Sequence, residues 1–332
     1  MALLRKGFDR VRPSVDIDAP AGRMMDRHAG RAVEICPACG SEIFATVGGE
    51  ASTFRCDDIS TLEHPKYAIR ECQACGLYYK SHVLRSESLR AYYDMLDFTP
   101  FDGDYGFPTD TALLAHLRRL PPGCRVLDFG CSTGRLLAAL GPGYDCSGVE
   151  ISEPAAEQAR RRGIAIVAER DLDDGQARAF EGIILSDVFE HLVEPTATLR
   201  SLAGRLAPGG RLFIVTGLAD AVRPRMLMAE HWYFRIAGHL QMLSLRHLDW
   251  LACAIGLQVV FVEVMSHYKR DPMRFVRQCL QAALYRTTKL TPASFMATII
   301  RKLPVVKRAC CWTNLPSTDQ LKDHVVAVLH KP

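Results

Sequence analysis

The chain has 332 residues, 48% of them hydrophobic and 23% charged, with a net charge of +4. It is long enough for one sizeable core and a small accessory unit, and its charge is too small to argue for a polyanionic partner. No run of about 18 apolar residues could span a bilayer, and the first residues lack the apolar stretch of a signal peptide. We therefore expect a cytoplasmic protein, whose twelve cysteines are reduced thiols, some of them binding metal.

The N-terminal region divides into two parts. Residues 1–30 are rich in Arg, Asp, Pro and Gly, which predicts a flexible arm. Residues 31–80 carry two Cys-x-x-Cys-Gly knuckles and resemble a zinc ribbon. Two thiolate pairs with this spacing make a tetrahedral zinc site, and four protein ligands leave no open position, so the metal should be structural. The predicted ligands are Cys36, Cys39, Cys72 and Cys75.

The rest of the chain follows a regular pattern. Residues 81–121 contain two short helical patterns and predict a helical lid or connector. Over residues 122–332, apolar runs of roughly four to six residues alternate with helical segments of about ten, which predicts an α/β domain with a parallel sheet covered on both faces. We expect seven strands, at 125–129, 144–150, 164–167, 182–185, 211–216, 257–264 and 324–330.

The most informative segment ends the first of these strands. Val126–Gly134 (VLDFGCSTG) brings an aspartate and a Gly-rich turn to the edge of the sheet, where ligands bind in doubly wound folds. The turn lacks the spacing of the dinucleotide fingerprint, which disfavours a nicotinamide cofactor. Glu150 ends the second strand, where an acidic residue can accept hydrogen bonds from both hydroxyls of a ribose.

Together these segments resemble the class I S-adenosylmethionine-dependent methyltransferases. The resemblance rests on VLDFGCSTG, GVEIS, ILSDVFEHLVEP, RLAPGGRLFIVT and HVVAVLHKP, which occur in this order over residues 122–332. It implies a doubly wound, seven-stranded Rossmann-like sheet that binds S-adenosylmethionine. Ser132 stands where the family has the middle glycine of G-x-G-x-G, and we expect binding to survive because serine is small. The implied cofactor contacts are Asp128, Gly130, Ser132, Gly134, Glu150, Ile151, Asp171, Ser186 and Asp187.

The acceptor side is expected after the fourth and fifth strands. His191 lies just past the fourth strand, and because histidine titrates near neutrality, it suits the base that removes a proton from a hydroxyl acceptor. It could equally orient a loop. Tyr233 and His239 fall where the resembling families form a lid, and they either act on the acceptor or only pack the lid. Tyr92, Tyr93 and Tyr105, ahead of the core, could close the same pocket from the other side, and for at least one of the three we expect packing instead.

An absent motif narrows the acceptor. Enzymes of this fold that methylate amines or amides often carry Asn/Asp-Pro-Pro-Tyr/Phe after the fourth strand, where this chain has Ser186–Phe189 (SDVF). A hydroxyl, carboxylate or carbon acceptor is therefore favoured. A zinc ribbon ahead of this domain also resembles bacterial enzymes that methylate sugars or natural products.

Residues 265–320 separate the last two strands and predict a basic helical insert. Over residues 264–310 there are ten lysines and arginines and one acid. Apolar residues recur at helical spacing over 271–303, so these helices could lie on an anionic membrane surface or pack on their own domain with solvated charges.

The leading hypothesis is an S-adenosylmethionine-dependent methyltransferase that acts on a sugar, a glycan precursor or a secondary metabolite at oxygen or carbon. The rival is a methyltransferase that binds or modifies RNA and uses the ribbon as its reader. The modest charge and the missing amine motif disfavour nucleic acid. The acceptor, the base and the oligomeric state stay open at this point.

Overall fold

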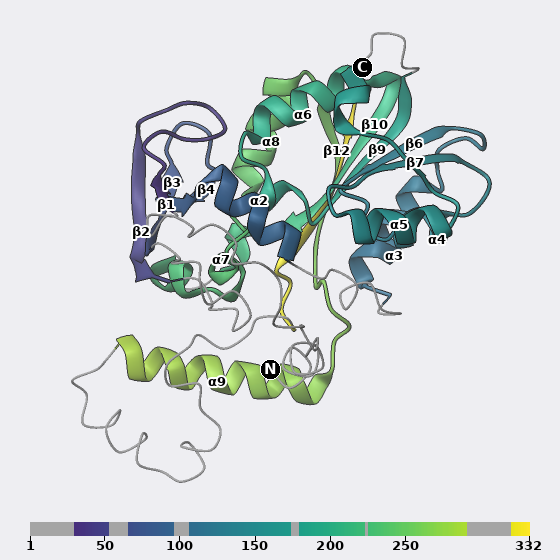
Figure 1. Cartoon of the computed structure of the whole chain (residues 1–332). Coiled ribbons are helices and arrows are strands. Elements are labelled where there is room, and N and C mark those ends of the chain that lie inside the picture. The colour runs from purple at the N-terminus through teal and green to yellow at the C-terminus, as the bar shows by residue number, and fades with distance from the viewer. Residues whose placement is uncertain (1–29, 53–65, 96–105, 174–178, 223–224, 291–319) are drawn as a thin grey trace, which may run out of the picture.

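The computed structural model describes residues 30–52, 66–95, 106–173, 179–222, 225–290 and 320–332. Its largest unit is a seven-stranded sheet with the order β12-β13-β10-β9-β6-β7-β8 (Figure 1). The strands from β6 to β10 in this sheet pair in parallel, and β13 runs antiparallel between β10 and β12. The predicted α/β class is confirmed. The strands are β6 (Arg125–Phe129), β7 (Asp145–Val149), β8 (Ala165–Ile166), β9 (Phe180–Ser186), β10 (Leu206–Gly217), β12 (Gln258–Met265) and β13 (His324–His330).

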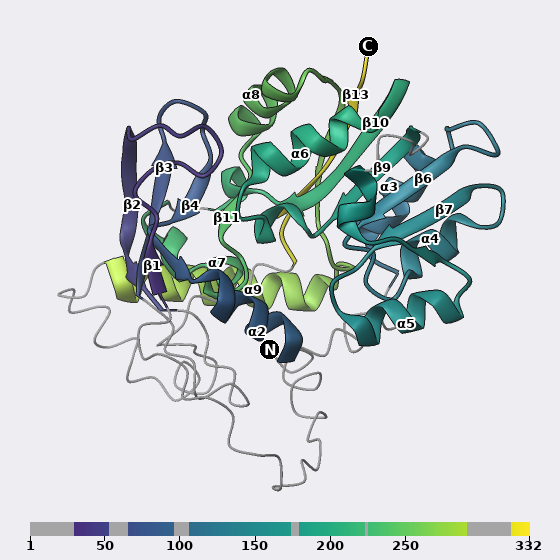
Figure 2. The ribbon, with the colours of Figure 1, turned by 45° about the horizontal axis from the view of Figure 1, so that its top comes forward.

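Successive residues of the central strands enter two different cores. On β9, Ile183 and Leu185 belong to one hydrophobic cluster, whereas Ile184 belongs to the other. Because both faces of the sheet are covered, these strands are continuous apolar runs rather than alternating ones. Figure 2 shows the helices on the two faces. The first core is covered by α6 (Pro195–Gly204) and α8 (Leu245–Ile255), the second by α3 (Pro108–Leu117), α4 (Arg135–Leu140) and α5 (Glu153–Arg161).

A smaller four-stranded sheet, with the order β11-β4-β3-β2, carries the cysteine segment. Three of its strands are consecutive in the chain: β2 (Phe44–Ala51), β3 (Tyr67–Cys72) and β4 (Tyr78–Lys80). The fourth, β11 (Gln241–Met242), comes from beyond β10 and pairs antiparallel with β4. The cysteine segment and the chain after β10 therefore share one sheet. A separate antiparallel pair joins β1 (Gly30–Ala32) to β5 (His82–Leu84).

Several short elements connect the strands. They are α2 (Ser86–Met95), α7 (Trp232–Arg235) and the 3-10 helices η3 (Glu169–Asp173), η4 (Phe189–His191), η5 (Ala219–Ala221) and η6 (Arg225–Glu230).

The basic insert is described in part. α9 (Pro272–Leu290) extends below the body of the molecule in Figure 1. Residues 291–303 of the predicted basic helices, and nearly all of the predicted arm at 1–30, lie outside the described residues. Among the helices of the described part, none combines the length and the apolar character needed to cross a membrane.

Candidate active site and cysteine cluster

The Gly-rich turn lies at the carboxyl end of β6, in the middle of the large sheet. Gly130 and Gly134 have φ values of 84° and 74°, and Ser132 between them has 47°. A Cβ on Gly130 would lie 2.5 Å from Cγ2 of Val188, so the turn needs glycine there. Asp128, the predicted acid of the turn, is buried. The turn is thus packed against the segment that follows β9.

Glu150 follows β7 and holds the same turn through its carboxylate. One oxygen accepts a hydrogen bond from the Ser132 N–H at 2.9 Å, and the other accepts from the Ser152 N–H at 2.7 Å. The neighbouring side chain, Ile151, is 69% exposed. An acceptor carboxylate thus lies beside an exposed apolar side chain, a combination that fits the donating hydroxyls of a ribose and the face of an adenine ring.

The other predicted cofactor residues follow β8 and β9. Asp171 lies in η3 with an exposed carboxylate, 3.6 Å from Nε of Arg170. Ser186 ends β9, and Asp187 after it has a φ of 54°. Partial burial and the nearby charge of Glu190 raise the pKa of Asp187 to about 7. All of these residues follow parallel strands, so they share one edge of the sheet.

His191, in η4, is fixed through one ring nitrogen. Its Nδ1 lies 2.7 Å from the hydroxyl of Tyr93 and 3.1 Å from the carbonyl oxygen of Gly238. Because a carbonyl oxygen can only accept, Nδ1 carries the ring proton and Nε2 is left as an acceptor. Burial lowers the pKa of His191, which keeps the ring neutral at pH 7. Tyr93, on α2, thus contacts His191, whereas Tyr105 lies outside the described residues.

Tyr233, in α7, is held by a buried carboxylate. Its hydroxyl donates to Oε1 of Glu190 at 2.5 Å and accepts from the N–H of Gly217 at 2.8 Å. The other oxygen of Glu190 accepts from the Thr216 hydroxyl at 2.9 Å. Burial raises the pKa of Tyr233 well above its ordinary value, so the phenol stays protonated. Tyr233 is therefore a fixed hydrogen-bonding group rather than a proton acceptor.

His239 packs against the two previous residues. Its ring centroid lies 4.7 Å from that of His191 and 4.2 Å from that of Tyr233. Burial, together with the neighbouring His191, lowers the pKa of His239 well below its ordinary value. Within the described residues its Nδ1 has no hydrogen-bond partner. The structure thus brings the three predicted catalytic residues together.

Sequence reasoning missed three residues at the same edge. His324 begins β13, and its Nδ1 lies 2.9 Å from Oδ1 of Asp323. Its Nε2 lies 3.7 Å from Oδ1 of Asp187. His267, just after β12, stacks on His324 with ring centroids 4.6 Å apart. One signal could have found them. The last strand, β13, is antiparallel to β10, so its first residues lie at the edge where the parallel strands end.

Two sets of these side chains have ligand atoms within 4.8 Å of one another and could in principle hold a metal ion. Several of their atoms are already engaged inside the protein. Glu190 accepts from Tyr233 and Thr216, and Nδ1 of His267 lies 3.0 Å from Oγ1 of Thr109. We therefore describe the sets as hydrogen-bonding groups. They are Asp187, His267 and His324, and Glu190, His191 and His239.

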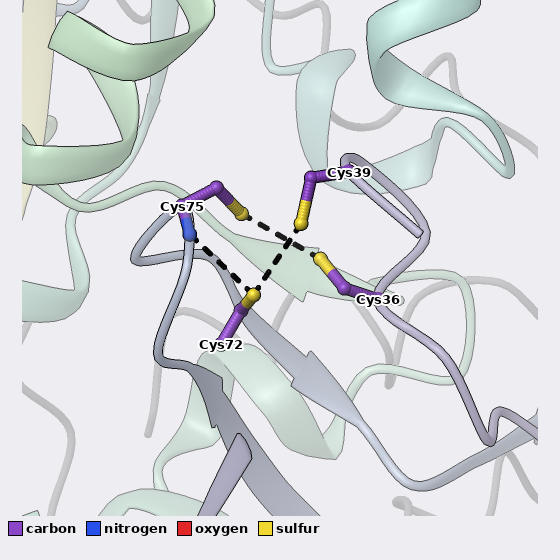
Figure 3. A group of neighbouring side chains, drawn as sticks. All are labelled: Cys36, Cys39, Cys72 and Cys75. Atoms are coloured by element: carbon purple, nitrogen blue, oxygen red, sulfur yellow. Dashed lines mark hydrogen bonds between the residues drawn. The ribbon is translucent and has the colours of Figure 1, made fainter. Parts of the chain in front are cut away.

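The four predicted cysteine ligands converge in the N-terminal sheet. Figure 3 shows their sulfur atoms facing one another, with Cys36 Sγ 3.6 Å from Cys75 Sγ and Cys39 Sγ 3.5 Å from Cys72 Sγ. All four sulfur atoms lie within 4.8 Å of one another. Tetrahedral zinc–thiolate bonds of about 2.3 Å place sulfur atoms roughly 3.8 Å apart, so this cluster has the right size for zinc. The hydrogen bond with Cys75 lowers the pKa of Cys36 to about 6.

Comparison with known proteins agrees with this geometry. Residues 108–262 match a family model described as a methyltransferase domain. A ubiquinone biosynthesis O-methyltransferase from Xanthomonas axonopodis pv. citri (strain 306) is 30% identical over 105 residues, which cover 29% of this chain and 44% of the relative. The same enzyme from Xylella fastidiosa (strain 9a5c) is 34% identical over 109 residues, or 30% of this chain and 44% of the relative. The match thus spans less than half the length of these relatives.

Solved structures give weaker likenesses. The N-methyltransferase NodS from Bradyrhizobium japonicum WM9, in complex with S-adenosyl-L-homocysteine, is 16% identical with a TM-score of 0.43, covering 74% of this chain and 97% of its own. The [4+2]-cyclase SpnF is 20% identical with a TM-score of 0.43, and the likeness covers 67% of this chain and 79% of that protein. At these scores the likenesses add nothing about function.

Residues 108–262, which contribute most strands of the seven-stranded sheet, therefore match a methyltransferase domain. The matched segment contains the Gly-rich turn, Glu150 and the three predicted catalytic residues.

Proposed function

We propose that this protein transfers the methyl group of S-adenosylmethionine to an oxygen atom of a small-molecule acceptor such as a sugar, a glycan precursor or a secondary metabolite. Carbon is the alternative acceptor atom. The observation that carries the proposal is that two sets of residues meet at one edge of the sheet. Asp187, at the end of the predicted cofactor side, lies 3.7 Å from His324 on the histidine-rich side. The O-methyltransferases among the relatives support oxygen.

The cofactor is assigned to residues that already have the required donors and acceptors. The turn from Asp128 to Gly134 would hold its methionine part, Glu150 its ribose and Ile151 its adenine, with Asp171 and Ser186 at the margins. S-adenosylmethionine supplies an electrophilic methyl group on a sulfonium. Much of the catalysis can then come from alignment of the acceptor with that group.

The acceptor is assigned to the side that carries His191, His239 and Tyr233. His191 offers an unprotonated Nε2, because its Nδ1 proton is given to Gly238. His239 adds a neutral ring beside it, and Tyr233 holds Glu190 in place from the interior. We assign His191 and His239 to direct contact with the acceptor and Tyr233 to the same wall of the pocket.

The cysteine cluster is assigned to a structural zinc ion. Four thiolates would fill its coordination sphere and leave no position for a substrate. The second knuckle is also held by the large domain: Nδ1 of His247 lies 3.2 Å from the carbonyl oxygen of Cys75, and the hydroxyl of Ser244 donates to that of Gly76 at 2.7 Å. Zinc would therefore support the side of the site that carries His191, His239 and Tyr233, which we call the acceptor wall.

The activity is tested with S-adenosylmethionine that carries a labelled methyl group and a panel of phenols, catechols, carboxylates and nucleotide sugars. We expect label in an organic product, S-adenosylhomocysteine in equal amount, and mass fragments that place the methyl on oxygen. Methylation at carbon would select the alternative. Binding of S-adenosylhomocysteine without label in any acceptor would contradict the proposed activity.

A second assignment concerns α9, for which we propose contact with an anionic lipid surface. Met273, Val276 and Leu280 follow one helical stripe and are 80%, 53% and 61% exposed. The helix contains basic residues and no acid, so its charge complements anionic headgroups. We expect sedimentation with phosphatidylglycerol vesicles but not with pure phosphatidylcholine. Replacing the three apolar residues with serine should abolish it, and equal sedimentation of this variant would refute the contact.

A further inference from the structure

The carboxyl edge of the sheet contains several buried histidines, and they differ in what stabilises their charged form. Nδ1 of His191 faces a phenol and a carbonyl, which are neutral, and Nδ1 of His267 faces the hydroxyl of Thr109. His239 has no partner at Nδ1 within the described residues. Burial lowers the pKa of each of these rings. In the described part of the chain, none of the three has a carboxylate hydrogen-bonded to its Nδ1, and the Glu190 carboxylate near His191 accepts instead from Tyr233 and Thr216.

His324 is arranged differently. Its Nδ1 lies 2.9 Å from a carboxylate oxygen of Asp323, and both side chains are almost fully buried. A carboxylate only accepts, so Nδ1 carries the proton and Nε2 has the free electron pair. The same carboxylate would stabilise the imidazolium that forms when Nε2 takes up a proton, as an acid that orients a histidine does in other enzymes.

The reacting nitrogen of His324 faces the cofactor side. Its Nε2 lies 3.7 Å from Oδ1 of Asp187, the residue after the predicted cofactor contact Ser186. That distance is too long for a direct hydrogen bond, and a hydroxyl that donates its one proton to Nε2 at about 2.8 Å fits beside Asp187. The side chain of Asp187 is 37% exposed and that of His324 is 3% exposed, so an acceptor would approach Nε2 from the Asp187 side.

We propose that Asp323 and His324 form the catalytic dyad that accepts the proton of the acceptor hydroxyl, with Asp323 as its positioning residue. The inference rests on the proposed methyl transfer to oxygen. In the step, the acceptor O–H bond breaks and its proton goes to Nε2 of His324. The oxygen forms a bond to the methyl carbon while the carbon–sulfur bond breaks, and that electron pair stays on sulfur. The imidazolium then returns its proton to water.

The charges around His324 determine the pH dependence. Burial by itself lowers the pKa of His324, but the hydrogen bond and charge of Asp323, with the charges of Asp187 and Glu190, together outweigh it, and the net shift of the pKa is upward from 6.5. A protonated ring cannot accept, so turnover should fall as the pH drops through this raised pKa. The titratable groups facing the ring are Asp323, Asp187, Glu190, His231, His239, His267 and Tyr233.

The first test is kinetic and uses the full chain with the acceptor that the labelled panel identifies. We expect His324→Gln to lower kcat at pH 7.5 by about 100-fold or more, the usual contribution of a general base. The deficit should shrink at high pH, where the acceptor ionises without help. Affinity for S-adenosylhomocysteine should change less than about 2-fold, because the cofactor is assigned to the Gly-rich turn and Glu150 rather than to His324. His330→Gln, at the far end of the same strand, is the matched control and should leave kcat unchanged.

The second test needs no acceptor. In protein saturated with S-adenosylhomocysteine, ¹⁵N NMR should show the Nδ1–H tautomer of His324 in wild type, and Asp323→Asn should shift it to Nε2–H. An Nε2–H tautomer in wild type, or kcat of His324→Gln within about 3-fold of wild type, overturns the dyad. A wild-type protein that methylates nothing overturns the proposed function instead, and the tautomer still decides whether the dyad exists.

Discussion

The proposed cofactor side and the proposed acceptor side of the sheet edge are assembled from different kinds of chain segment. On the proposed cofactor side, Gly130, Glu150 and Asp187 directly follow β6, β7 and β9, which are parallel neighbours in the sheet. On the proposed acceptor side, the side chains come from distant parts of the chain: α2, η4, α7, the segment between α7 and β11, and the β12–β13 pair. The first side depends on local turn geometry, and the second depends on long-range packing.

The largest effect is expected from removing the cysteine cluster, which should disturb the acceptor side and leave the cofactor side nearly unchanged. Structural zinc contributes on the order of 10 kcal/mol to folding of such sites. Replacing Cys72 and Cys75 with serine should unfold the small sheet and raise amide hydrogen exchange at Leu240–Met242, because β11 loses its partner strand. Exchange at Gly130–Gly134 should change little.

The control for this experiment is Cys253→Ser, which changes an exposed thiol on α8. Equal exchange in all three proteins would show that the cysteine cluster does not support the acceptor wall. A rise in exchange at the Gly-rich turn as large as that at β11 would mean that the two sides are not separable.

The cofactor side is tested by Glu150→Ala. The change removes a carboxylate that accepts hydrogen bonds from two backbone N–H groups. It also removes the proposed acceptor of the two ribose hydroxyls. Hydrogen bonds to charged groups contribute about 1.5–3 kcal/mol each, so losing both ribose hydrogen bonds should weaken affinity for S-adenosylmethionine by at least about 100-fold in calorimetry. Asp128→Ala should also weaken binding. Glu157→Ala, on the surface of α5, is the control, and affinity unchanged in both site variants would remove this assignment.

On the acceptor side, Tyr233→Phe should lower stability without affecting the cofactor. The variant loses the hydrogen bond to Glu190 and leaves the buried N–H of Gly217 without its acceptor. We expect the free energy of unfolding in urea to fall by about 2 kcal/mol, with affinity for S-adenosylhomocysteine unchanged. Tyr144→Phe removes only a long contact of 3.4 Å and should change little. A large loss of cofactor affinity in Tyr233→Phe would break the distinction between the sides.

The smallest effect is expected at Ser132. Its φ of 47° is costly for a residue with a Cβ, so Ser132→Gly should raise stability by about 0.5–1 kcal/mol in thermal unfolding. Affinity for the cofactor should stay the same or improve. Gly130→Ala, in the same turn, should act in the opposite direction because of Val188. A destabilised Ser132→Gly would indicate that the serine side chain makes a contact worth more than the strain.

The difference between the two sides also explains how far the sequence could be interpreted. The N-cap at Ser244, which accepts from the His247 N–H, and the left-handed Gly256 at the end of α8 follow from local rules, as do the seven strands. β10 was expected from Arg211 but begins at Leu206, because the register shifts across the glycine pair before Arg211. β11, Asp323 and His324 were not predicted, since their roles depend on partners far away in the chain.

One consequence follows from the two-residue strand β11. Many accessory modules can be exchanged between enzymes because they fold without help from the catalytic domain. Here the edge of β4 is completed by a strand from beyond β10, so a chain cut after Lys80 would leave backbone N–H and C=O groups of that strand without partners. The metal-binding segment is therefore tied to its own catalytic domain, and the two should be inherited, expressed and engineered as one unit.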